Sequence, residues 1–281
     1  MTWLVELRGS EVREPRARVI ALAHAGGWPT AFRGWREVLP PDVALVAAQL
    51  PGRATRAGEA GVDRVEPLAG ALTEAVLDLE PLPFVVVGHS FGSVLGYEMT
   101  KSLEVAGRPP ELLVVSGRQA PCLPSEPPFL HQGSDADLLA HLDLIGGIPE
   151  GLLRREDFVQ ATLNAIRADL AALETYRRPV SGTDVDVLAV GAADDPIVNS
   201  ARLHLWSLET SGAFACRLFT GGHFFLYQPD AAAAVAREVV RALGPTSPKF
   251  VRNVGPMRHT PVAPPRDRHP VSATSAGRDL P

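Results

Sequence analysis

Six continuous apolar runs constrain this fold more than any other feature of the sequence, because segments with helical signals separate them. Runs such as FVVVGH (84–89) do not alternate apolar with polar residues, which indicates strands that are covered on both faces. Such strands in alternation with helices predict a mainly parallel, doubly wound α/β sheet. The six predicted strands are residues 18–25, 43–50, 84–89, 112–117, 185–192 and 214–222.

The segments between these strands have the features of helices. The segment VEPLAGALTEAVLDL (65–79) repeats apolar residues at helical spacing. Another helix is predicted from the residue after Ser90 to about Ala106. Gly107 follows it, and glycine commonly ends a helix. Three further helices are predicted at 31–39, 200–209 and 230–243.

Residues 121–179 interrupt this alternation between the fourth and fifth predicted strands. After a proline-rich loop, a helix is predicted with Ser134 as its N-cap and Gly146 at its end. A second helix carries a single apolar stripe from Val159 to Leu173. We expect this all-helical insertion to lie over the carboxyl edge of the sheet as a lid; the alternative is a helical subdomain with no gating role.

The sequence predicts one α/β domain over residues 1–244 and a tail over residues 245–281. The tail is rich in proline and basic residues and poor in large apolar ones, so we expect it to be disordered. The formal net charge of −5 argues against a nucleic-acid-binding protein, which usually presents a basic face. No apolar run approaches the roughly 20 residues that span a bilayer, and the N-terminus lacks the pattern of a signal peptide.

The chain has two cysteines, Cys122 and Cys216, which form no disulfide framework and are interpreted as small apolar residues. This cysteine usage is typical of a reducing compartment, so we expect a cytoplasmic protein. No group of candidate ligands has the spacing of a zinc site. We expect no metal, no other cofactor and a monomeric protein.

The motif Gly88-His89-Ser90-Phe91-Gly92 predicts a nucleophilic serine between a strand and a helix. In α/β hydrolases such a serine occupies a strained turn, and the residues two positions before and after it must be small. Gly88 and Gly92 meet this requirement. His89 is interpreted as a structural residue whose side chain points away from Ser90. The alternative is an ordinary strand-to-helix turn that happens to match the motif.

A base for the serine is expected later in the chain, because this fold places the acid and then the histidine after the nucleophile. His223 directly follows the strand at 214–222, at the sheet edge where sites in open α/β sheets form. His204 instead falls within a predicted helix, and His259 and His269 fall in the tail. We therefore predict His223 as the general base.

The acid that orients this histidine is expected at the end of the preceding strand. The segment DVDVLAVGAADDPIV offers both Asp194 and Asp195 at that position. Asp195 precedes Pro196, which fixes the turn that follows. We favour Asp195 as the acid and keep Asp194 as the alternative; a further possibility is that both only cap the turn before the next helix.

Two backbone N–H groups are predicted to stabilise the oxyanion. One belongs to Phe91, the residue after the serine. The other is assigned to Ala25, in the HAGG stretch (24–27) at the end of the first predicted strand, because the glycine pair lets the backbone approach a ligand closely. A plain glycine turn is the alternative interpretation of this stretch.

In this order along the chain, the motifs resemble those of type II thioesterases, the discrete editing hydrolases of polyketide synthases and non-ribosomal peptide synthetases. The resemblance covers roughly residues 15–243, and it departs from the family at Leu22-Ala23 and at Phe91, where Phe-Pro and Met are usual. The motifs that carry it are HAGG (24–27), FRGW (32–35), LPGR (50–53), GHSFG (88–92), LETYRRP (173–179), DDP (194–196) and GGHFFL (221–226).

This resemblance implies an α/β-hydrolase fold with a helical lid. It implies Ser90 as nucleophile, His223 as base and Asp195 as acid, with the N–H groups of Ala25 and Phe91 as oxyanion donors. The implied reaction is hydrolysis of acyl groups from the phosphopantetheine thioester of acyl or peptidyl carrier proteins. The alternatives are an acyltransferase or cyclising thioesterase, a small-molecule esterase, and an inactive scaffold that binds carrier proteins.

Overall fold

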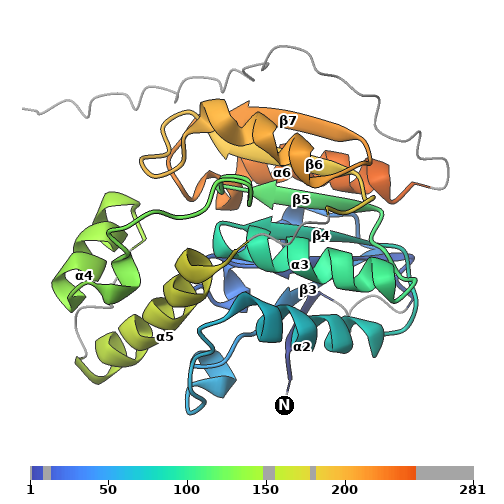
Figure 1. The fold of residues 1–281 in the computed structure, drawn as a ribbon. Coiled ribbons are helices and arrows are strands. Elements are labelled where there is room, and N and C mark those ends of the chain that lie inside the picture. The colour runs from blue at the N-terminus through green and yellow to red at the C-terminus, as the bar shows by residue number, and fades with distance from the viewer. Residues whose placement is uncertain (1, 9–13, 148–155, 178–181, 245–281) are drawn as a thin grey trace, which may run out of the picture.

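The apolar runs form a seven-stranded sheet in the computed structural model of the protein (Figure 1), which describes residues 2–8, 14–147, 156–177 and 182–244. The strand order is β1-β3-β2-β4-β5-β6-β7, and neighbours are parallel except for β1 with β3. The predicted mainly parallel, α/β-hydrolase-type sheet is confirmed. The strands are β1 (Leu4–Arg8), β2 (Ala17–Leu22), β3 (Val43–Ala48), β4 (Phe84–His89), β5 (Leu112–Ser116), β6 (Val187–Ala192) and β7 (Phe214–Phe219).

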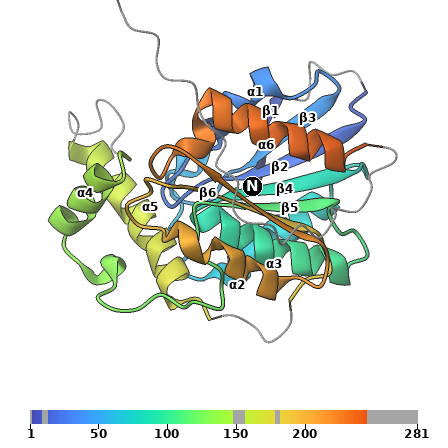
Figure 2. The same cartoon turned by 90° about the horizontal axis from the view of Figure 1, so that it is seen from above.

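Helices cover both faces of this sheet (Figure 1 and Figure 2). On one face, α1 and α6 pack in a cluster with strand residues such as Val19 and Ala21. On the other face, α2 and α3 pack in a cluster with Ile20 and Leu22. Alternate residues of one strand therefore pack in two apolar layers, which explains why the strand sequences are continuously apolar. The helices are α1 (Trp35–Val38), α2 (Val65–Leu77), α3 (Phe91–Val105) and α6 (Pro229–Ala242).

The edge strand β1 is not among the strands predicted from the sequence. It pairs antiparallel with β3, with Leu4 opposite Ala48, and its residues 4–7 are only partly buried or exposed. Its sequence LVELR places charged residues within the strand, as is common where one edge faces solvent. A strand of this kind lacks the continuous apolar run by which the other six strands were predicted.

Two predicted helices have a different form in the structure. The helix predicted at 31–39 is divided into a 3-10 helix, η1 (Pro29–Phe32), and the four-residue α1, which has Gly34 as its N-cap. The second is a 3-10 helix throughout, η5 (Ser200–Glu209), and the side chain of Asn199 caps its first turn. Short apolar periodicity does not distinguish the α form from the tighter 3-10 form.

The insertion contains the 3-10 helix η3 (Leu130–Gln132) and two α-helices, α4 (Asp135–Leu144) and α5 (Glu156–Thr175). Ser134 is the N-cap of α4, as predicted, and its Oγ accepts a hydrogen bond from the Asp137 N–H at 3.2 Å. Figure 1 and Figure 2 both show α4 on the outer side of α5, away from the sheet.

The apolar stripe of α5 contacts two different partners. Near the end of the helix, Ala172 and Leu173 pack in the same cluster as α2 and α3. Earlier in the helix, the stripe packs against α4 and forms a separate cluster. The insertion is thus anchored to the sheet domain through the end of α5. The members of the separate cluster are Leu138, Leu142, Leu163, Ile166 and Leu170.

Parts of the predicted organisation lie outside the described residues. These parts are 148–155 and 178–181 in and beside the insertion, and the whole predicted tail, 245–281. The gating role of the insertion and the disorder of the tail therefore stay predictions. Within the described residues, no helix has the length and apolarity that a membrane crossing requires.

Candidate active site

Ser90 lies between the end of β4 and the start of α3, in a backbone conformation that residues other than glycine rarely adopt. Its φ is 53° and its ψ is −115°. Its N–H donates to the carbonyl of Ser116, at the end of the neighbouring strand β5, at 2.7 Å. The adjacent strand therefore helps to hold the strained turn.

The two glycines of the GHSFG motif leave no room for a side chain. A Cβ on Gly88 would lie 2.2 Å from the carbonyl oxygen of Gly92. A Cβ on Gly92 would lie 2.1 Å from the carbonyl oxygen of Leu22, the last residue of β2. Both contacts are far closer than atoms can approach without repulsion, so this turn requires glycine at both positions.

His223 and Asp195 meet beside the carboxyl edge of the sheet. Nδ1 of His223 donates to Oδ2 of Asp195 at 2.8 Å, and both side chains are almost fully buried, at 2% and 1% exposure. The other carboxylate oxygen of Asp195 accepts two backbone N–H groups of the following turn, at 3.0 and 3.2 Å. Asp194 instead accepts from the Gly221 N–H at 3.2 Å. The structure brings Asp195, rather than Asp194, to His223.

A cavity of about 730 Å³ lies between Ser90, His223 and the insertion. Ser90, His223 and Ala25 line the cavity. A smaller cavity of about 280 Å³, lined largely by polar residues such as Arg118, also reaches Ser90. The serine is therefore bordered by an apolar space and by a polar one. The apolar residues of the insertion that line the larger cavity include Leu142, Ile145, Ile166, Leu170 and Leu173.

The two predicted oxyanion donors lie at the ends of the adjacent strands β2 and β4. Ala25 is the second residue of the turn 24–27, in which the Gly27 N–H donates to the carbonyl of His24 at 2.8 Å. The next N–H along this turn, that of Gly26, donates to Oδ2 of Asp169 at 2.7 Å. Phe91 is the first residue of α3, where backbone N–H groups have no acceptor within the helix.

Two further histidines lie near the site: the ring of His89 packs against that of His223, and the ring of His24 packs against that of His89. The ring centroids of His89 and His223 are 5.1 Å apart, and Nδ1 of His89 is 3.0 Å from Oγ of Ser116. Nδ1 of His24 is 3.0 Å from the Tyr227 hydroxyl. Burial lowers the pKa of His24 to about 3 and places the pKa of His89 well below its ordinary value, and the nearby His223 adds to both effects. Both rings are therefore neutral at neutral pH.

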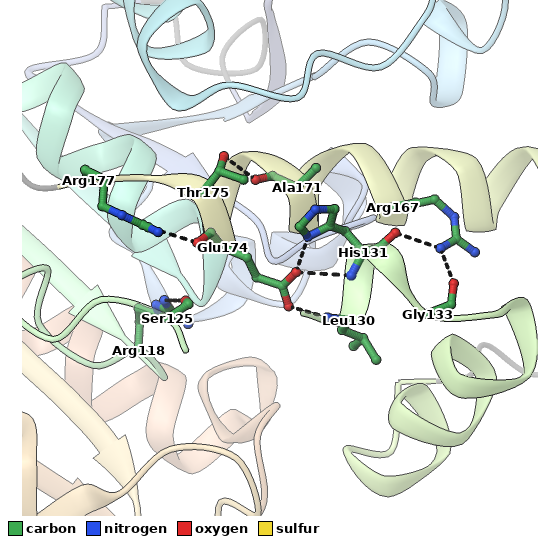
Figure 3. Close-up of polar contacts among 10 residues, drawn as sticks. All are labelled: Arg118, Ser125, Leu130, His131, Gly133, Arg167, Ala171, Glu174, Thr175 and Arg177. Carbon is green, nitrogen blue, oxygen red and sulfur yellow. Dashed lines mark hydrogen bonds and ion pairs between the residues drawn. The ribbon is translucent and has the colours of Figure 1, made fainter. Parts of the chain in front are cut away.

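A polar network on α5 fastens the loop that leads into α4 (Figure 3). Glu174 accepts hydrogen bonds from the backbone N–H groups of Leu130 and His131, at 3.0 and 3.1 Å, and from Nδ1 of His131 at 2.5 Å. Arg167 donates to the carbonyls of His131 and Gly133, at 2.8 and 2.6 Å. These contacts tie η3 to α5 beside the larger cavity. No local pattern in the sequence indicated them.

The family model of the thioesterase domain matches residues 17–243 of this chain. The chain is 36% identical to thioesterase PikA5 of Streptomyces venezuelae over 214 residues, which are 74% of this chain and 75% of that protein. It is 34% identical to a probable cadicidin biosynthesis thioesterase of Streptomyces griseus over 229 residues. That alignment covers 81% of this chain but 63% of the relative, which is less than two thirds of its length.

Two solved structures are similar over most of the chain. The type II thioesterase BorB from the borrelidin biosynthetic cluster has a TM-score of 0.78 and 32% identity, and the match covers 87% of this chain and 98% of that one. The type II thioesterase YbtT from the yersiniabactin NRPS/PKS pathway has a TM-score of 0.76 and 26% identity, with 86% and 100% covered.

Proposed function

Because the chain belongs to the thioesterase family, we propose that it hydrolyses acyl groups from the phosphopantetheine thioester of a carrier protein. Its similarity to type II thioesterases of biosynthetic pathways supports this substrate class. The observation that supports it most directly is the buried His223–Asp195 pair, 2.8 Å apart, of which His223 lines the same cavity as Ser90 on its strained turn.

In the first half of the proposed reaction, Nε2 of His223 accepts the hydroxyl proton of Ser90 while Oγ attacks the thioester carbonyl carbon. The carbonyl oxygen becomes the oxyanion of a tetrahedral intermediate, and the N–H groups of Ala25 and Phe91 donate to it. The C–S bond then breaks, and His223 returns the proton to the departing pantetheine thiolate. The acyl group stays on Ser90 as an ester.

In the second half, a water molecule gives a proton to His223 and attacks the acyl carbon. The ester bond breaks, Ser90 recovers the proton, and the free carboxylic acid leaves. Asp195 keeps the other proton of His223 on Nδ1 and stabilises the imidazolium that forms in each half. Neutral His24 and His89 add no positive charge that would oppose this imidazolium.

The two spaces beside Ser90 correspond to the two halves of the proposed substrate. The larger cavity has apolar walls from the insertion, which suit an acyl chain. The smaller cavity has polar walls, which suit the amide groups of the pantetheine arm. We propose that the insertion acts as a lid that encloses the acyl chain while the thioester reacts.

A panel of acyl groups tests this function. Each acyl group is presented on a carrier protein, on free coenzyme A and as a simple ester, and the products are identified by mass spectrometry. We expect the fastest release from the carrier protein, with the free acid as the product. Transfer to an amine or an alcohol would identify an acyltransferase or cyclising thioesterase, and faster release from esters would identify an esterase. If none of these substrates is turned over and Ser90 does not react with a fluorophosphonate, the protein would be an inactive scaffold that binds carrier proteins.

A further inference from the structure

A buried ion pair joins the insertion to the core of the protein. Nη1 and Nη2 of Arg53, in the loop after β3, lie 2.6 and 2.7 Å from the two carboxylate oxygens of Asp169 in α5. Both side chains are only 2% exposed. Such a pair is costly to desolvate and contributes little net stability, so its presence points to a role in fixing a particular geometry. The proposed catalytic steps involve neither residue directly.

Asp169 has a third partner, and that partner belongs to the turn that carries Ala25. The Oδ2 atom that contacts Arg53 also accepts from the Gly26 N–H at 2.7 Å. Gly26 has a φ of 74° at the third position of the turn 24–27, which is the mark of a type II turn. The orientation of the central peptide, between Ala25 and Gly26, distinguishes this turn from type I. The carboxylate therefore holds the peptide whose direction defines the turn.

Other contacts pack α5 and the loop after β3 against this turn. A Cβ on Gly26 would lie 2.2 Å from Cγ1 of Ile166, so the helix packs directly on the glycine backbone. Arg53 also donates to the carbonyls of Pro51 and Gly27, at 3.2 and 3.4 Å. Three segments that are distant in sequence thus meet at the Asp169 carboxylate: the turn after β2, the loop after β3, and α5.

We propose that Arg53 and Asp169 are positioning residues that hold the turn 24–27 so that the Ala25 N–H faces the oxyanion of a thioester attacked by Ser90. This inference rests on the proposed function and deepens it. Because Asp169 engages the Gly26 N–H, that group is occupied and the Ala25 N–H is the one left to face the substrate. A helix of the insertion therefore completes the catalytic geometry in addition to covering the cavity.

The test replaces both charges together. Removal of one partner alone leaves a buried charge and strongly destabilises a protein, whereas replacement of both by apolar residues of similar size is often neutral. The double variant Arg53→Met/Asp169→Leu therefore removes the acceptor of the Gly26 N–H with the least risk to folding. The matched control is Asp135→Asn, which disrupts another ion pair of α5, Arg167–Asp135 at 2.6 Å, away from this turn.

Four quantities are measured for each variant: kcat and KM on an acyl-loaded carrier protein, the inhibition constant of an alkyl boronic acid, and the melting temperature. The boronic acid forms a tetrahedral adduct with a nucleophilic serine and places an oxygen where the oxyanion forms. We expect the double variant to lose about 100-fold in kcat, the typical effect of a displacement near 1 Å. KM should change little, because the lost interaction belongs to the transition state. The affinity of the double variant for the boronic acid should fall in parallel with kcat. Asp135→Asn should have the kcat, KM and boronate affinity of the parent.

A folded double variant with the parent's kcat and boronate affinity would overturn the proposal. A lower melting temperature would also overturn the proposal if kcat and the boronate affinity equal the parent's at a temperature where the variant is folded. The ion pair would then contribute only to stability. If the double variant does not fold, Arg53→Lys and Asp169→Glu decide instead, because each keeps both charges of the buried pair. Lysine leaves the Asp169 carboxylate in place and should retain most of kcat, whereas the longer glutamate displaces the acceptor of the Gly26 N–H and should lower kcat. Equal, parental kcat in both variants would overturn the proposal.

Failure of the proposed function has a different signature. If the parent releases no acid from carrier-bound thioesters, or if Ser90→Ala releases it as fast as the parent, then the Ser90 mechanism itself is wrong. In the ion-pair experiment, by contrast, the parent is active and Ser90-dependent, and only the positioning variants differ from it.

Discussion

At the scale of single residues, the two neighbouring acids of the DDP turn differ in what they contact. Asp195 accepts from His223, whereas Asp194 accepts from the backbone N–H of Gly221. The sequence favoured Asp195, which precedes Pro196, but kept Asp194 as the alternative. Both residues follow the same strand, and the direction of the turn before Pro196 decides which carboxylate faces the histidine. The structure therefore supports different consequences for the same substitution at the two positions.

Asp195→Asn is expected to lower kcat by about 10⁴-fold, because an amide does not stabilise the imidazolium or the required tautomer of the histidine. Asp194→Asn, its neighbour and matched control, is expected to keep a rate close to that of the parent. Steady-state kinetics on a carrier-bound acyl thioester measure both variants. Similar losses in the two variants, or a parental rate for Asp195→Asn, would show that the acid is assigned wrongly.

The environment of His24 predicts a loss of stability in mild acid. Its pKa is lowered from 6.5 to about 3 in the folded protein. Between these values the unfolded chain binds a proton that the folded chain does not, so the free energy of unfolding decreases as the pH falls below 6.5. By pH 5 the loss amounts to at most about 2 kcal/mol. His89 acts in the same direction.

His24→Gln should therefore reduce the slope of unfolding free energy against pH between about pH 7 and pH 5. Urea denaturation at a series of pH values measures this slope for the parent and the variant. An unchanged slope would mean that burial does not shift the pKa of His24 as described.

Some site residues were visible in the sequence and others became visible only in the fold. Ser90 and His223 are marked by glycines around them and by their position after predicted strands. Arg53 and Asp169 are 116 positions apart, and nothing near either residue indicates its partner. Local patterns report turns and strand ends, whereas ion pairs of this kind depend on how distant elements pack.

At the scale of secondary-structure elements, α4 and α5 were predictable as helices but their contacts were not. The apolar stripe of α5 indicated a buried face. It did not indicate that one part of this face would line a cavity with α4 while another part joined the core of the sheet domain. Local sequence patterns also failed to predict the strand β1 and the 3-10 form of η5, because edge position and helix type depend on neighbouring elements.

The end of α4 offers a test of the acyl cavity with two adjacent residues. Ile145 lines the cavity, whereas Leu144 is 61% exposed. Ile145→Trp should exclude part of a long acyl chain, and the loss of two buried methylenes, about 1.6 kcal/mol, corresponds to roughly a tenfold lower kcat/KM. Acetyl groups should be unaffected.

The control variant Leu144→Trp should retain the parent's preference for all chain lengths. The ratio of kcat/KM for decanoyl and acetyl carrier protein is the measurement in each variant. The same ratio in Ile145→Trp and in the parent would exclude this cavity as the site of the acyl chain.

At the scale of the whole molecule, the alternation of apolar strands and helices was sufficient to predict six of the seven strands and the mainly parallel sheet. Parallel strands connected by helices bring their carboxyl ends to one edge, so the residues after β2, β4, β6 and β7 gather there. The insertion was expected to lie over that edge, but the contacts that hold it, such as those of Asp169 and Glu174, could not be predicted because they join residues distant in sequence. The monomeric state and the cytoplasmic location stay predictions.

Formation of an acyl ester on Ser90 is tested most directly by mass spectrometry of the protein quenched in acid shortly after mixing with an acyl-loaded carrier protein. The parent should gain the mass of the acyl group on the peptide that contains Ser90, and it should release the free acid. Ser90→Ala should show no such gain and should release the acid about 10⁶-fold more slowly. Release by Ser90→Ala at the parent's rate, without any acylated peptide in the parent, would contradict the mechanism.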